Sequence, residues 1–372
     1  MAIITIDARK YFDFGIGTYI RHLVDNLAKL RSRHSFRLLI SPGDEKQIVP
    51  PSGWAVKVVP YGKYSVSEFF LLGRSLKSSG AASLFHSPHY TLPLGLKNPS
   101  VVTIHDLIPL RFPQLFSPAQ RLYAYAMMGH AVRDARYVLT DSEFTRQDIL
   151  RSFDVRAEKV VAVHLGIDPR FRPLSQGEKQ KFRVRRNLTR PYVLFVGNPK
   201  PHKGILILLR AFTRIAAAFP TLDLVFVGGK PTRDSSIRLA VQAAGIGQRV
   251  KELEHISTEY LVRVYNCAEM LVMPSLYEGF GLPALEAMAC GTCAVVSGAA
   301  SLPEVVGDAA LVFQTGNAES LEVSMESILR DEGLRKRLID KGKRQVRRFS
   351  WEEAAKRTMD IYESVLAEKR TA

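Results

Sequence analysis

The chain has 372 residues, which at roughly 150 residues per domain predicts two domains. Its apolar share of 46% and charged share of 24% are those of an ordinary globular protein and exclude a disordered or fibrous chain. Lysine and arginine number 52 against 36 acidic residues, so the formal net charge is +16 and an anionic partner is expected. Nucleic acid, anionic lipid headgroups and phosphorylated small molecules all fit that charge, which is densest in residues 170–190 and 330–348.

Membrane spans and disulfides are not expected. The most apolar run, residues 204–209, ends at Arg210 and is too short to cross a membrane. The first residues lack the basic flank and the length of a signal peptide. Three cysteines exclude a disulfide framework, and Cys290-x2-Cys293 lacks the further ligands of a zinc site, which favours partly buried thiols near a helix end. We expect a protein of the cytoplasm, or one peripheral to the inner face of the cytoplasmic membrane.

The first half of the chain alternates short apolar segments with helical ones. Its helical pattern is clearest between residues 19 and 30, where the apolar side chains share one face. Residues 168–177 contain two prolines and a glycine and are the predicted linker. Strands are predicted at residues 2–6, 36–40, 55–59, 83–86, 101–105, 137–141 and 160–164.

The alternation restarts after the linker. It predicts an α/β protein with two doubly wound, Rossmann-like domains, residues 1–172 and 173–351. Ligands of such sheets bind beyond the carboxyl ends of the strands, so we expect the site in the cleft between the domains. The predicted strands are residues 192–196, 222–227 and 270–273, and the predicted helices are residues 205–219, 234–244, 283–289, 318–330, 333–349 and 352–369.

Two glycines follow the first strand. In Gly15-Ile16-Gly17 they allow backbone amides to approach an anion where a helix begins. A dinucleotide fingerprint would need a third glycine where Ile20 stands, so nicotinamide binding is disfavoured. A loop that faces a sugar or a phosphate and a plain tight turn both remain open.

Three further strand ends carry polar residues. Lys203 follows the strand at 192–196, at the start of a helix, and is either a phosphate ligand or a solvated lysine. His105, followed by Asp106, ends the strand at 101–105 and is either a site residue or a structural histidine. The pair His86-x2-His89 lacks further metal ligands, which leaves a cleft-lining loop or a turn.

The segment from residue 274 to residue 291 is the most informative. Pro283 suits the first helical turn, so the amides of Gly279, Phe280, Gly281 and Leu282 are expected at the positive end of a helix, as an anion cradle. Two carboxylates, Glu278 and Glu286, flank that cradle and would repel a bare phosphate. They suit a ligand with hydroxyl groups on both sides of its phosphates, which is the chemistry of a nucleotide sugar. No Asp-x-Asp motif is present to hold a cation, so no metal and no cofactor are expected.

At these residues the chain resembles the retaining glycosyltransferases of family 4, which have the GT-B fold. The glutamate-x7-glutamate segment from Glu278 to Glu286 carries the resemblance most specifically. The Gly15–Gly17 loop, His105-Asp106, residues 196–204 and the segment Phe349-Ser350-Trp351-Glu352 are also similar. The resemblance implies that the last helix, about residues 352–372, crosses back to the first domain.

The resemblance also implies roles for individual residues. Glu278 would contact the transferred sugar and Glu286 the ribose, while Lys203 and residues 279–282 would hold the diphosphate. His105 would lie near the sugar or the β-phosphate, and Gly15 and Gly17 near the junction of donor and acceptor. The family often has arginine where this chain has Asn198, so Lys200 or His202 would have to compensate. Base contacts are expected from residues 228–230 and 255–258.

The implied reaction is transfer of a hexose to a glycan, with retention of configuration. The Asn198-Pro199…Pro201-His202-Lys203 form of the second loop resembles that of bacterial mannosyl- and related hexosyltransferases of surface polysaccharide pathways. This favours GDP-mannose as donor, with UDP-sugars as the alternative. The acceptor would be a glycan, and lipid diphosphates at the membrane are expected as its carriers. The basic surface of the protein would contact that anionic membrane. Two rivals are a GT-B-like epimerase or phosphorylase and a nucleic-acid-binding protein, and the second is disfavoured because aromatic-flanked basic motifs are missing.

Overall fold

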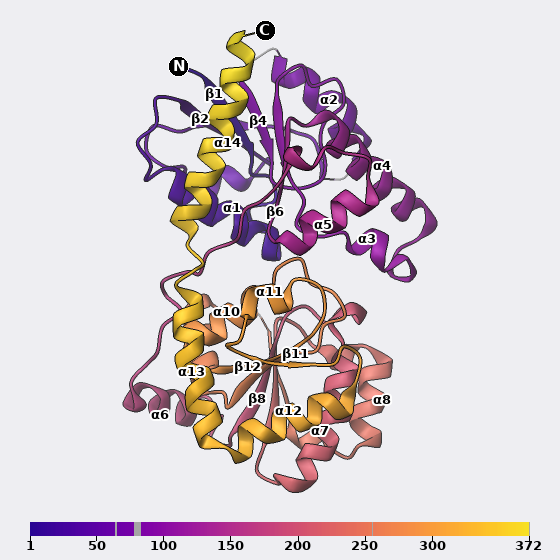
Figure 1. The fold of residues 1–372 in the computed structure, drawn as a ribbon, viewed down its shortest axis with the longest axis vertical. Helices are drawn as coiled ribbons and strands as arrows, with labels where there is room; N and C mark the ends of the chain where they lie inside the picture. The colour runs from indigo at the N-terminus through magenta and orange to yellow at the C-terminus, as the bar shows by residue number, and fades with distance from the viewer. Residues whose placement is uncertain (64, 78–82, 255, 372) are drawn as a thin grey trace. The chain divides into compact units, whose positions relative to one another are not determined.

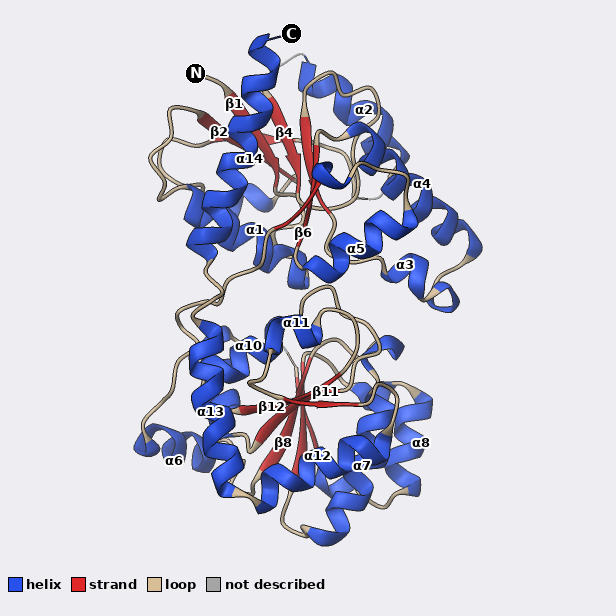
Figure 2. Cartoon of the chain, viewed as in Figure 1, coloured by secondary structure: helices blue, strands red, loops and turns tan. Residues whose placement is uncertain are grey.

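The computed structural model describes residues 1–63, 65–77, 83–254 and 256–371, and it divides into two compact units (Figure 1). Unit 1 comprises Met1–Gly166 together with Ser350–Ala372, and unit 2 comprises Ile167–Phe349. Each unit is built around one parallel sheet, with helices on both faces of the sheet (Figure 2). Among the residues that the structure describes, no helix combines the length and the apolar character needed to cross a membrane.

The sheet of unit 1 has the strand order β3-β2-β1-β4-β5-β6-β7, and all its described pairings are parallel. Strands β4 and β5 are buried along their whole length, as expected for a parallel sheet covered on both faces. The strands are β1 (Ile3–Asp7), β2 (Ser35–Ile40), β3 (Ala55–Val58), β4 (Leu84–Ser87), β5 (Ser100–Thr103), β6 (Tyr137–Thr140) and β7 (Val160–Ala162). The helices are α1 (Phe14–Leu27), α2 (Val66–Lys77), α3 (Ile108–Arg111), α4 (Pro118–Asp134), α5 (Glu143–Ser152) and α14 (Trp351–Thr371).

The last helix, α14, belongs to unit 1 although the rest of that unit ends at residue 166. At its start the Trp351 ring stacks on His22 with centroids 4.8 Å apart. Further along, the Tyr362 hydroxyl lies 2.5 Å from His86 Nδ1. Burial lowers the pKa of His86 to about 3, so its ring is neutral and structural. The predicted return of the last helix to the first domain is therefore confirmed.

The sheet of unit 2 has the order β10-β9-β8-β11-β12-β13, again with parallel pairings. Apolar side chains of β8, β9, β11 and β12 form its core with those of α7 and α12. The strands are β8 (Tyr192–Val196), β9 (Asp223–Val227), β10 (Val250–Leu253), β11 (Met270–Met273), β12 (Cys293–Ser297) and β13 (Leu311–Phe313). The helices are α6 (Gln176–Arg185), α7 (Ile205–Ala218), α8 (Ser235–Ala243), α9 (Thr258–Cys267), α10 (Leu282–Ala289), α11 (Leu302–Val306), α12 (Ala318–Arg330) and α13 (Glu332–Val346).

Two local expectations need correction. Helix α1 begins at Phe14, five residues before the apolar stripe that predicted it, so Gly15 and Gly17 lie within its first turns rather than in a preceding loop. The thiols of Cys290 and Cys293 are buried rather than partly buried, and Cys293 begins strand β12. The start of α1 and the burial of the thiols both depend on tertiary contacts, which the local sequence pattern does not contain.

Candidate functional site

In each sheet the strand order reverses at one point. In unit 2 the chain runs outward from β8 through β9 to β10, and then returns to β11 on the other side of β8. Ligands of open parallel sheets bind at such a switch point, beyond the carboxyl ends of the two strands. The loops that leave β8 and β11 are residues 197–204 and 274–281, which contain most of the predicted site residues.

These two loops meet in an ion pair. Lys203 Nζ lies 2.8 Å from both carboxylate oxygens of Glu278, and the Ser275 hydroxyl donates to Glu278 Oε1 at 2.6 Å. The Lys203 side chain is 22% exposed and that of Glu278 is 10% exposed. An ammonium group has three N–H donors, and Glu278 uses two of them. Lys203 is therefore a positioned cation that can donate to one more acceptor, such as a phosphate oxygen.

The backbone holds Lys203 in place. Gly204 has φ +68°, and a Cβ there would lie 2.0 Å from the carbonyl oxygen of Pro274, so only glycine allows the two loops to approach. The Leu276 amide also donates to the His202 carbonyl at 2.7 Å. Burial, and to a smaller extent the positive charge of Lys203, lowers the pKa of His202 to about 4, so this ring is neutral near pH 7. Of the two residues expected to compensate for Asn198, the exposed Lys200 alone can carry a positive charge at that pH.

Helix α10 follows directly. Gly281, at φ +110°, precedes its first residue, and a Cβ there would lie 2.6 Å from Leu302 Cδ2. The N–H groups of the first turn have no partner within the helix and lie at the positive end of its dipole. The Phe280 side chain is buried edge-on against Phe349, with ring centroids 5.7 Å apart, so Phe280 can offer a ligand only its backbone. The Ser301 hydroxyl bonds to the carbonyl oxygens of Glu278 and Phe280, both at 2.9 Å, and fixes this turn.

Glu286 lies one turn into α10 and has a different environment from Glu278. The Tyr265 hydroxyl, on α9, donates to Glu286 Oε2 at 2.6 Å. Burial raises the pKa of Glu286 to about 7, and the hydrogen bond from Tyr265 opposes that rise. Glu286 is thus a carboxyl group with one oxygen bound and one oxygen available to a hydroxyl group.

His105 lies in unit 1, just after β5. Its Nδ1 is 2.8 Å from Asp141 Oδ2, and its Nε2 is 3.1 Å from the Pro88 carbonyl oxygen. Both partners are acceptors, so both contacts are hydrogen bonds only if the ring is an imidazolium. Burial alone would lower the pKa of His105, but the Asp141 carboxylate, together with Asp106 and the Pro88 carbonyl, opposes burial, and the net effect raises that pKa above 6.5. The two acceptors and the raised pKa thus favour the cationic form of His105.

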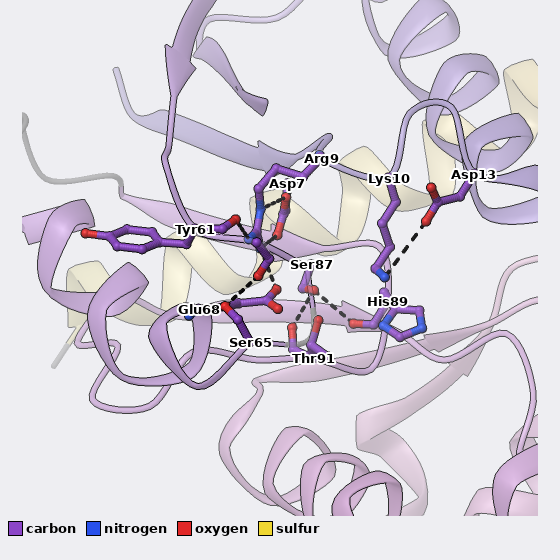
Figure 3. A network of polar contacts seen from close by, with 11 residues as sticks. Asp7, Arg9, Lys10, Asp13, Tyr61, Ser65, Glu68, Ser87, His89 and Thr91 are labelled. Atoms are coloured by element: carbon purple, nitrogen blue, oxygen red, sulfur yellow. Dashed lines mark hydrogen bonds and ion pairs between the residues drawn. The ribbon is translucent and has the colours of Figure 1, made fainter. Parts of the chain in front are cut away.

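A polar network that the sequence did not reveal occupies the switch point of unit 1, between β1 and β4 (Figure 3). Arg9 donates to Asp7 Oδ1 at 2.8 Å and to Glu68 Oε1 at 2.7 Å, and its side chain is 3% exposed. Lys10 is also buried, and burial lowers its pKa to about 8, although Asp13 lies 4.0 Å away. No local pattern in residues 7–10 shows this network, because Glu68 is 59 residues distant.

The two glycines of α1 differ. A Cβ at Gly17 would lie 2.4 Å from the Tyr11 carbonyl oxygen, so the packing of the preceding turn requires glycine there. A Cβ at Gly15 would meet nothing within 4 Å. Packing therefore explains Gly17, and it leaves Gly15 without a structural reason to be glycine.

The predicted residues fall in both units. Unit 2 contains Asn198, which is exposed, together with Lys203, residues 278–282 and Glu286, whereas unit 1 contains Gly15, Gly17 and His105. Of the loops expected to contact a base, residue 255 lies outside the described residues. Sequence reasoning missed Ser275, Ser301 and Tyr265. Ser275 could have been found from its spacing of three residues to Glu278, whereas the other two carry no local signal.

Comparisons with known proteins identify the family of the chain. A family model described as Glycosyltransferase Family 4 matches residues 15–171, and one described as Glycosyl transferases group 1 matches residues 176–345. The chain is 31% identical over 285 residues to O-antigen chain mannosyltransferase B of Escherichia coli, covering 75% of this chain and 74% of that protein. It is 28% identical over 264 residues to O-antigen chain mannosyltransferase RfbU of Salmonella typhimurium strain LT2, covering 71% and 69%.

The fold has a matching solved structure. Sucrose-phosphate synthase from Thermosynechococcus elongatus superposes with a TM-score of 0.80 over 99% of this chain and 100% of that chain, at 24% identity. The two parallel sheets and the returning last helix are those of the GT-B fold. The expected class of enzyme is confirmed together with its fold. The chain belongs to the family 4 glycosyltransferases and is a glycosyltransferase with the GT-B fold.

Proposed function

We propose that this glycosyltransferase moves mannose from GDP-mannose to a hydroxyl group of a surface glycan, with retention of the anomeric configuration and without a metal ion. The observation that carries the proposal is the Lys203–Glu278 pair, with 2.8 Å contacts, at the switch point of unit 2 beside the start of α10. The names of the two mannosyltransferase relatives support mannose, and family membership supports a nucleotide-sugar donor.

The site residues have distinct proposed roles. The third N–H of Lys203 and the amides of residues 279–282 bind the diphosphate, because they combine a point charge with the positive end of a helix. Glu286 accepts hydrogen bonds from the ribose through the oxygen that Tyr265 does not occupy. Glu278 orients the sugar, and Asn198 adds a neutral contact to the donor. In unit 1 we assign His105 to the sugar or the β-phosphate and Gly15 and Gly17 to the donor.

The chemistry follows from these charges. The bond between the anomeric carbon and the phosphate oxygen breaks, negative charge develops on the departing diphosphate, and the sugar becomes oxocarbenium-like. Lys203 and the α10 amides stabilise the departing charge, which is the electrostatic task that usually contributes most to catalysis. The acceptor hydroxyl attacks on the same face, and its proton passes to an oxygen of the leaving diphosphate. Because Lys203 supplies the positive charge, no step requires a metal.

We further propose that unit 1 binds the acceptor and that the acceptor is carried on a lipid diphosphate. The net charge of +16 supports peripheral binding to the anionic inner face of the cytoplasmic membrane. Sedimentation with phosphatidylglycerol vesicles tests this step. Binding should weaken as salt is raised, because counterions screen the attraction. Absent or salt-insensitive binding would contradict the membrane proposal and leave the transferase proposal intact.

The central experiment is a screen of donors. The enzyme is incubated with GDP-mannose, UDP-glucose and UDP-galactose in the presence and absence of EDTA, and sugar release and transfer are measured. GDP-mannose should be consumed in both conditions, and the proton spectrum of the product should show the configuration of the donor. Turnover of UDP-sugars alone would contradict the proposed donor, and a product of inverted configuration would contradict the proposed retention. Loss of activity with EDTA would contradict metal independence. An epimerised sugar or phosphorolysis would indicate the rival enzyme classes.

A further inference from the structure

Two basic segments that the donor site does not use meet in unit 2. They are helix α6 (Gln176–Arg185) and helix α13 (Glu332–Val346), and both line a pocket of about 310 Å³. The two helices lie 147 residues apart in sequence, counted from the last residue of α6 to the first of α13. The fold therefore brings Lys179 and Arg183 of α6 and Arg335 of α13 to one cavity.

The charges in this pocket do not balance. Arg183 Nη2 lies 3.6 Å from Glu269 Oε1, and Arg335 Nη1 lies 2.5 Å from Glu269 Oε2. Glu269 is the single acidic residue among the described residues that line the pocket. Lys179 lines it as well, and within the described parts of the chain no carboxylate lies within 4 Å of its ammonium group. Three cations therefore face one carboxylate.

The remaining wall is neutral and already ordered. Burial raises the pKa values of the Cys267 and Cys293 thiols, so both are uncharged near pH 7. Arg183 Nη2 donates to the Cys267 carbonyl at 3.0 Å, which fixes the direction of its guanidinium group. An anion entering this pocket would meet donors that are held in position before it binds.

The pocket is separate from the donor site. Glu269 directly precedes β11 and Thr292 directly precedes β12, so the pocket lies at the amino ends of these strands. Lys203 and Glu278 follow the carboxyl ends of β8 and β11, at the opposite edge of the same sheet. A ligand in this pocket would therefore leave the candidate donor site free.

We propose that this pocket is a second anion site, which binds the phosphate group of a small phosphorylated molecule. Phosphate is the favoured anion because its oxygens accept paired hydrogen bonds from guanidinium groups and point-charge contacts from lysine. A volume of about 310 Å³ is at the small end of ligand sites, which suits a pyrophosphate or a sugar phosphate and excludes a nucleic acid strand. The inference does not depend on the identity of the donor.

The test uses inorganic pyrophosphate as the probe and calorimetry on the full chain. All proteins carry Lys203→Ala, which removes the cation of the proposed donor site. Adding Lys179→Ala should weaken pyrophosphate binding about tenfold, because one charge-assisted contact is lost. Lys181→Ala is the matched control, since Lys181 is exposed on the same helix and does not line the pocket. It should leave the affinity unchanged.

Further outcomes separate the sources of the phosphate. If vesicles containing phosphatidic acid bind in a Lys179-dependent manner and pyrophosphate does not, the site stands and its phosphate belongs to a lipid headgroup. Equal binding of both probes by the Lys179→Ala and Lys181→Ala proteins would overturn the proposal. So would pyrophosphate binding that is present in the wild-type chain and disappears with Lys203→Ala alone, because the donor site would then be the one anion site detected.

Discussion

The two switch points of this molecule have the same topology but differ in how far the charge of their basic residue is buried and compensated. In unit 1, β1 and β4 end in the Arg9 network, whose arginine is 3% exposed and bound by two carboxylates. In unit 2, β8 and β11 end in the Lys203–Glu278 pair, whose lysine is 22% exposed and bound by one carboxylate. The cavity beside the first network holds about 10 Å³, room for roughly one water molecule.

The difference shows how the same sheet edge can serve structure or ligand binding. A guanidinium group enclosed by Asp7 and Glu68 has its charge compensated within the protein and has little to offer a ligand. A lysine with a donor left over is incompletely compensated and can bind an added anion. We therefore expect the first switch point to contribute mainly to stability, and the proposed donor chemistry belongs to the second.

The largest expected effect is on stability. Arg9→Ala would leave two buried carboxylates without their cation, at a cost of about 3–5 kcal/mol in the free energy of unfolding. Both tryptophans, Trp54 and Trp351, belong to unit 1, so urea unfolding followed by tryptophan fluorescence reports on this unit.

The control for that change is Arg33→Ala. Arg33 pairs with Glu363 at 2.9 Å in the same unit, but its side chain is 65% exposed, so the loss should stay below about 1 kcal/mol. Similar losses in the two variants would remove the contrast between a buried network and a surface pair.

The next effect is on catalysis. Lys203→Ala should lower kcat about 10²–10³-fold, the range found when one donor to a developing anion is removed. Lys181→Ala, an exposed lysine on α6 outside this loop, should change kcat little. Transfer is measured with radiolabelled donor at saturating concentration. If both variants retained wild-type kcat, the assignment of the leaving-group charge to Lys203 would be wrong.

A smaller effect concerns donor affinity. Tyr265→Phe removes the 2.6 Å hydrogen bond to Glu286, worth about 1 kcal/mol, and should raise the donor KM roughly fivefold with kcat nearly unchanged. That hydrogen bond lowers the pKa of Glu286, so its loss should also move the rise of kcat/KM with pH to higher pH. Tyr260→Phe, on the same helix, should move neither quantity. An unshifted pH profile in Tyr265→Phe would indicate a purely structural role.

The smallest effect is a change in one titration. His105 should titrate above pH 6.5 in a pH series of NMR spectra, because Asp141, with smaller contributions from Asp106 and Pro88, opposes the effect of burial. In Asp141→Asn the burial contribution remains and the main opposing charge is lost, so the midpoint should fall below pH 6.5. The signal is assigned by its disappearance in His105→Gln. A midpoint that stayed above 6.5 in Asp141→Asn would show that another group holds the proton.

How much the sequence predicts depends on whether a feature is local. The fully buried strand β11 is a continuous apolar run and was predicted at its observed bounds, and helix α10 begins one residue before the predicted Pro283. Strand β12, which is also fully buried, was not predicted. Helix α4 was missed because its buried and exposed apolar side chains, Met128 and Leu122 among them, form no single stripe. The contact of Arg9 with Glu68 spans 59 residues, and that of Tyr265 with Glu286 spans 21 residues. Such contacts depend on how the fold brings distant segments together, and no local spacing in the sequence predicts them.

The most direct test of the account is the thermal stabilisation by GDP-mannose of the wild-type chain beside Glu286→Ala. Ligands that bind the folded state raise its melting temperature, by an amount that grows with the ratio of ligand concentration to Kd. We predict a clear rise for the wild type with GDP-mannose, a smaller one with UDP-sugars, and almost none for Glu286→Ala, whose own melting temperature should stay near that of the wild type. Equal stabilisation of both proteins, or none by any nucleotide sugar, would contradict the placement of the donor site in unit 2.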